Sequence, residues 1–212
     1  MIPFDSVAFF ANVAQYNEAI WPAQAVAFAL GLVALVLLFA RTTWSSMLIA
    51  ALLAASWIWM GGVYHLQHFA TINFLAPVFG IAFILQGLLF LWTGLVTRRV
   101  AFGFEPGVAG WTGLALAAFA IAGYPALAWG LGHAWPELPA FGVAPCPTGI
   151  FTFAMLLTTL GRSPVHLAII PLLWALISGT AAYFLDMPLD IVMPVIGLST
   201  FALIVWKNRA LS

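Results

Sequence analysis

Long apolar stretches without charged residues follow one another along almost the whole chain, and they constrain the fold more than any other feature. The 212 residues include six Lys or Arg and six Asp or Glu, whereas a typical soluble domain carries about 25% charged residues. A membrane-crossing helix needs about 20 mostly apolar residues, and several runs reach that length. The sequence therefore predicts an all-α integral membrane protein. Its neutrality argues against a nucleic-acid partner, which would require a basic surface.

Helical spacing of apolar residues, with prolines near helix starts, divides the chain into eight segments of one membrane domain, residues 1–212. The first, about 5–18, is a short helix lying along the membrane interface, with Asp5 or Ser6 as its cap. Seven predicted membrane spans follow, at about 20–40, 44–68, 74–97, 107–131, 147–161, 165–185 and 189–206. The expected fold is a seven-helix transmembrane bundle preceded by an interfacial helix.

An odd number of spans separates the charges between the two sides of the membrane. The basic residues fall on one side, namely Arg41, Arg98, Arg99, Arg162, Lys207 and Arg209. The acids fall on the other, namely Asp5, Glu18, Glu137, Asp186 and Asp190, leaving only Glu105 among the bases. Because loops rich in Lys and Arg stay cytoplasmic, we expect the N-terminus outside and the C-terminus inside.

Ligand-type side chains gather at the predicted outer side. His65 and His68 share a helix face. On the same side, His133 follows the end of the span 107–131 and Cys146 lies at the start of the span 147–161. Imidazole and thiolate groups bind zinc or copper, so these four residues form a candidate metal site. As an alternative, His68 or His133 is an axial haem ligand. Further candidate ligand-binding residues are Glu18, Tyr64 and Gln86.

A simpler interpretation of the same residues stays open. Histidines at a membrane boundary are often only polar helix ends, a free cysteine commonly behaves as a small apolar residue, and Gln86 suits a hydrogen bond between helices. The sequence shows no catalytic constellation, so an enzyme is the least expected class. Two hypotheses follow. The protein either has a binding or permeation site for a metal ion or small ligand in its outer half, or is a structural or accessory subunit of a larger membrane complex.

Five blocks of sequence resemble one family. They are Tyr16–Gln24, Trp57–Phe69, Leu85–Trp92, Ala144–Phe153 and Ile170–Trp174. Together they are similar to an uncharacterised family of bacterial polytopic membrane proteins, classed as a domain of unknown function. The resemblance implies a multi-pass protein of the bacterial inner membrane, where other membrane subunits are candidate partners, and it implies no activity.

Overall fold

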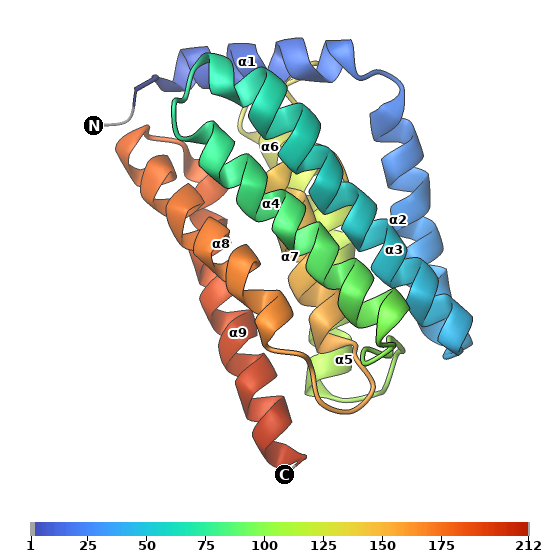
Figure 1. The fold of residues 1–212 in the computed structure, drawn as a ribbon. Coiled ribbons are helices and arrows are strands. Elements are labelled where there is room, and N and C mark those ends of the chain that lie inside the picture. Colours follow the sequence, from blue (N-terminus) through green and yellow to red (C-terminus); the bar gives the residue numbers. More distant parts are fainter. Residues whose placement is uncertain (1–2, 212) are drawn as a thin grey trace.

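Helices form every regular element of the computed structural model, which describes residues 3–211. The first, α1 (Ser6–Ala19), lies across one end of a helical bundle, and the C-terminus lies at the opposite end (Figure 1). The side chain of Asp5 caps α1 by accepting a hydrogen bond from the backbone N–H of Ala8, at 2.8 Å. The predicted all-α bundle of seven helices with a preceding short helix is confirmed.

Within residues 3–211, six of the bundle segments are long and apolar enough to cross a membrane. They are α2 (Ala23–Ala40); α3 (Thr43–Trp59) continued by η1 (Met60–His68) and η2 (Phe69–Thr71); α4 (Ala76–Phe90) with η3 (Leu91–Val96); α5 (Val108–Ala118), η4 (Phe119–Gly123) and α6 (Tyr124–Gly130); α8 (His166–Phe184); and η5 (Pro188–Ile191) with α9 (Val192–Ala210). Their outward side chains are mainly apolar, as contact with a lipid bilayer requires. The chain is a membrane protein.

The seventh bundle helix, α7 (Pro145–Leu157), is shorter and occupies the centre. All of its residues except Cys146 are buried, and it packs against α5, α8 and α9. It ends before the predicted limit of residue 161, because Thr158 leaves the helical conformation. The Lys207 ammonium then donates hydrogen bonds to the carbonyls of Leu157 and Thr159, which satisfies groups at the helix end.

The two ends of the bundle differ in charge. At the end opposite α1, Arg41 forms an ion pair with Glu105, at 3.4 Å, and Arg41 and Arg98 line one depression. The end covered by α1 carries the loop of residues 131–144, with His133 and Glu137, and the turn with Asp186 and Asp190. Basic and acidic residues therefore separate along the bundle.

π-Helical turns interrupt three spans in the described part of the chain: η1, η3 and η4. Turn η4 comes directly before Tyr124 and Pro125, and proline lacks the N–H that an α-helical ladder needs at this point. Turn η1 contains Gly61 and Gly62 and carries Tyr64 and His65. Tyr64, His65 and Tyr124 are all buried, so these wider turns lie where polar side chains enter the bundle.

Candidate functional site

A group of polar side chains lies buried among the helices near the α1 end. The Tyr124 hydroxyl of α6 donates a hydrogen bond to Oδ1 of Asp190 in η5. Asp190 is only 8% exposed, and it is the one carboxyl classed as buried in residues 3–211. Cys146 Sγ of α7 lies 3.4 Å from the Ser178 hydroxyl of α8. Four elements from distant parts of the sequence thus bring a carboxyl, a phenol, a thiol and a hydroxyl together.

Local backbone structure explains these positions. Pro188 starts the short 3₁₀ turn η5, which holds Asp190 inside the bundle before α9 begins. Ala144 is extended and Pro145 occupies the first turn of α7, so Cys146 lies at a helix N-terminus. The positive end of the α7 dipole therefore faces the space that Asp190 also lines, and Asp190 supplies the negative group that this dipole favours.

A small cavity of about 40 Å³ lies beside these groups, lined among others by Tyr64, Tyr124, Cys146 and Asp190. Phe9, Phe10, Val13, Tyr16 and Asn17 of α1 also line it, so α1 covers it. Such a cavity is large enough for water, since one water needs about 10–15 Å³ of this kind of space. A polar wall containing a buried carboxyl makes it a candidate binding site.

Hydrogen bonds hold α1 over this cavity. The Tyr16 hydroxyl donates to the Val143 carbonyl at 2.8 Å and accepts from the Trp59 indole at 3.0 Å. Burial raises the pKa of Tyr16 well above its ordinary range, more than the bond from Trp59 lowers it, so the hydroxyl keeps its proton. The Asn17 amide donates to the carbonyls of Pro136 and Leu138. The cover is therefore tied to the loop of residues 131–144.

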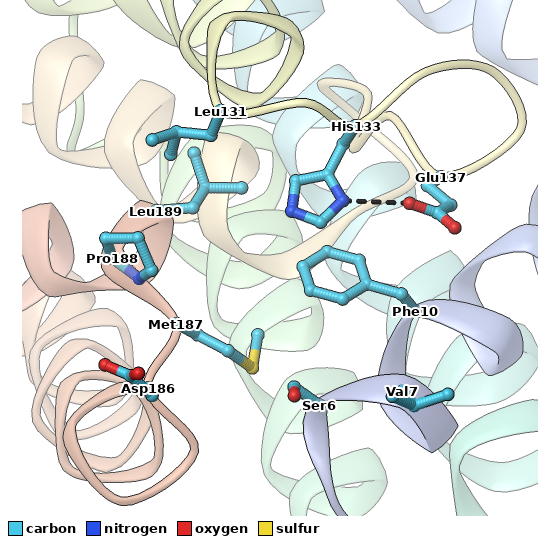
Figure 2. A pocket seen from close by; sticks show the side chains of 10 residues that line it. All are labelled: Ser6, Val7, Phe10, Leu131, His133, Glu137, Asp186, Met187, Pro188 and Leu189. Atoms are coloured by element: carbon cyan, nitrogen blue, oxygen red, sulfur yellow. Dashed lines mark hydrogen bonds and ion pairs between the residues drawn. The ribbon is translucent and has the colours of Figure 1, made fainter.

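A larger open cavity, about 440 Å³, lies beside the small one. We call it the vestibule (Figure 2), and it is lined by Ser6, Val7, Phe10, Leu131, His133, Glu137, Asp186, Met187, Pro188 and Leu189. His133 Nδ1 lies 2.8 Å from Glu137 Oε2, and the imidazole stacks on Phe10 with ring centroids 3.8 Å apart. Phe10, Glu137 and Leu189 line both cavities, so they form the partition between them.

The four predicted metal ligands lie in separate surroundings. His65 is fully buried among aromatic rings, with Phe83 at 4.4 Å and Trp174 at 5.2 Å between centroids, and neither ring nitrogen has a hydrogen-bond partner. His68 packs edge-on against Tyr16, and His133 and Cys146 have the partners described above. In residues 3–211, no three His, Cys, Asp or Glu side chains are grouped as a metal ion requires. The predicted zinc or copper cluster is not assembled.

The three predicted ligand-binding residues also lie in different surroundings. Tyr64 lines the small cavity together with Cys146. Glu18 is exposed on α1 and is not among the residues that line the vestibule or the small cavity. The Gln86 amide donates to the Leu167 carbonyl at 2.9 Å, which ties α4 to α8. Of this group, only Tyr64 belongs to the candidate site.

Sequence reasoning missed Tyr124, Ser178 and Asp190 as parts of one site. Asp190 was expected at this end of the bundle, as a charge at the start of the last predicted span, 189–206. Its sequence neighbours gave the missing signal, because Leu189 and Ile191 flank it and a solvated loop would more often have polar residues there. The fourth histidine, His166, is the first residue of α8, and its Nε2 lies 3.1 Å from the Thr93 hydroxyl, away from the candidate site.

The model of a family of unknown function, DUF6064, matches residues 6–212. The chain belongs to this family. The match spans all the helices and every residue of the candidate site, and it confirms the resemblance to an uncharacterised family. No curated protein and no solved structure matches the chain. Membership of DUF6064 brings no activity with it, so the functional argument depends on the site itself.

Proposed function

We propose that this multi-pass membrane protein binds a small polar ligand in the cavity beside Asp190. The observation that carries the proposal is a nearly buried carboxyl, hydrogen-bonded to Tyr124, in the wall of a cavity inside an otherwise apolar bundle. Ionisable side chains within membrane spans are costly and commonly mark the path or site of a ligand. Cys146, from the predicted set of ligands, and Tyr64 line the same space.

The packing supports a closed binding site more than a continuous pore. From Cys146 onward, α7 runs into the core, where Ile150, Phe151 and Phe153 are fully buried. Trp57 fills the same region, and its indole donates to the Thr152 hydroxyl at 2.9 Å. A ligand that reaches Asp190 therefore enters and leaves through the α1 end, past the partition of Phe10, Glu137 and Leu189.

The single cysteine of the chain reports on this site directly. We expect hydrogen peroxide, a neutral reagent about the size of two waters, to oxidise the Cys146 thiol to a sulfenic acid with release of water in the folded protein in lipid nanodiscs. Phe10→Ala, which thins the partition, should speed the reaction. Cys146→Ser is the blank, and mass spectrometry of the intact protein measures the product. Reaction only after unfolding in detergent would overturn the proposal. Together with co-purification of a fixed partner, that result would favour the accessory-subunit hypothesis.

A further inference from the structure

We infer that the ligand of this cavity is a small monovalent cation, reached through the vestibule. The inference rests on the proposed function and adds the chemical class of the ligand. Three properties of the structure carry it: the sign of the charge around both cavities, the size of the inner one, and the kinds of atoms in its wall.

The charge around the two cavities is acidic. Glu137 and Asp186 line the vestibule, and Glu137 and Asp190 line the inner cavity. Lys and Arg are absent from both sets of lining residues, and Arg41 and Arg98 lie at the opposite end of the bundle. Carboxylates in a cleft with low-dielectric walls concentrate cations and repel anions. The charge around both cavities therefore favours a cationic ligand over an anionic one.

The inner cavity is too small for an organic ligand. Its volume of about 40 Å³ leaves room for roughly three water-sized particles, at about 10–15 Å³ each. A bare or partly hydrated inorganic cation fits this space. A quaternary ammonium compound or an amino acid does not fit.

The wall atoms select among inorganic cations. Asp190 supplies one carboxylate, and Tyr64 and Tyr124 supply phenol oxygens, which are hard ligands. Glu137, the other carboxyl among the lining residues, is paired with His133 at 2.8 Å. Calcium and magnesium sites generally use further carboxylates and waters, and Asp190 alone balances only one positive charge. Zinc needs three or four nitrogen, sulfur or carboxylate ligands, and in residues 3–211 no three His, Cys, Asp or Glu side chains are grouped closely enough to supply them. An alkali cation such as Na⁺ or K⁺ is the ligand that this wall suits.

Glu137 is the charged residue among the three that line both the vestibule and the inner cavity. It lies on the partition, and His133 holds its carboxylate at 2.8 Å while stacking on Phe10 (Figure 2). A cation in the vestibule therefore meets a fixed carboxylate before it passes Phe10 toward Asp190. Glu137 is a positioning group on the route, and Asp190 is the binding group.

Silver ion tests the inference, because Ag⁺ is a monovalent cation of about the size of Na⁺ and K⁺ and reacts with thiols. Its reaction with Cys146 forms an S–Ag bond and releases the thiol proton. We expect excess NaNO₃ or KNO₃ to slow Ag⁺ modification of Cys146 at least about tenfold relative to choline nitrate at equal ionic strength. Asp190→Asn should abolish this protection. The remaining free thiol is counted with a maleimide after unfolding.

Two further comparisons distinguish a failure of the cation assignment from a failure of the binding site itself. Glu137→Gln should slow Ag⁺ modification about tenfold and leave the rate of reaction with neutral hydrogen peroxide unchanged. Glu18→Gln, an exposed carboxyl of α1 outside both cavities, is the matched control. Equal protection by choline, or none by Na⁺ and K⁺, overturns the cation assignment and leaves the binding site standing if the neutral reagent still reaches Cys146. If neither reagent reaches it before unfolding, the binding site itself fails.

Discussion

His65 and Asp190 are both buried titratable residues, and they differ in hydrogen bonding. Both ring nitrogens of His65 lack a partner among the aromatic rings, whereas Asp190 accepts a hydrogen bond from Tyr124. A buried polar group without a partner costs about 1–3 kcal/mol. His65 therefore stabilises the bundle by filling space, and Asp190 holds a specific polar arrangement.

His65→Leu tests this view of the imidazole. Leucine has a similar volume and no polar atoms, so we expect the thermal unfolding midpoint to stay the same or rise. His65→Ala should lower the unfolding free energy by about 2 kcal/mol or more, because it opens a cavity. Thermal unfolding in detergent micelles measures both variants. A loss in His65→Leu as large as that in His65→Ala would indicate a bound group on the ring nitrogens.

The pair of Tyr124 and Asp190 should behave as one unit. Tyr124→Phe leaves the Asp190 oxygen buried without its donor, which should cost about 1–3 kcal/mol of unfolding free energy. Asp190→Leu leaves the hydroxyl unpaired at a similar cost. The double variant should lose less than the two single losses together, because both polar groups are gone. Additive losses in this double-mutant cycle would mean that the hydrogen bond contributes nothing to stability.

At the scale of the element, the approximate helix ranges could be predicted from the sequence. The burial of the candidate site inside the bundle could not be predicted. The second helix was expected at 20–40 and is Ala23–Ala40, since charge and proline mark its limits locally. The carbonyl of Leu157 at the early end of α7 accepts a hydrogen bond from Lys207, fifty residues later in the chain. The burial of Asp190 depends likewise on Tyr124, and such tertiary pairings leave no periodic signal.

Gly61 and Gly62 also differ in a tertiary contact that the sequence does not reveal. They therefore offer a matched pair of variants. In the sequence, either glycine would permit a close helix approach. In the structure, a Cβ at Gly61 would lie 2.6 Å from the Gly80 carbonyl oxygen of α4, whereas one at Gly62 would meet nothing within 4 Å. The backbone of α4 therefore requires glycine only at the first position.

We expect Gly61→Ala to lower the unfolding free energy by about 1–3 kcal/mol, because the added methyl forces η1 and α4 apart. Gly62→Ala should have no effect or a small stabilising one, since alanine restricts the unfolded chain. Thermal unfolding of both proteins in the same detergent gives the comparison. Equal effects of the two substitutions would show that the contact between η1 and α4 is not as close as described.

At the scale of the whole molecule, α1 lies across one end of the bundle (Figure 1). That end has the acidic cavities, and the opposite end is basic. The separation follows from the odd number of spans, and it was predictable because charged residues are so few. The grouping of the cavities under α1 was not predictable, because α1 is only weakly amphipathic and hydrogen bonds to a distant loop help to hold it in place.

The orientation of this bundle in the membrane is the last prediction. Basic loops stay in the cytoplasm, so the α1 end should face outward and ligands should arrive from outside. Ala134 and Ala101 are both exposed, Ala134 in the vestibule-side loop and Ala101 beside Arg41 and Arg98. In a Cys146→Ser background, a membrane-impermeant maleimide should label Ala134→Cys in intact bacterial cells and Ala101→Cys only after permeabilisation. Both variants keep every Lys and Arg, so the topology signal is unchanged. The reverse labelling pattern would place the acidic cavities in the cytoplasm, and the cation would then be bound from the inner side.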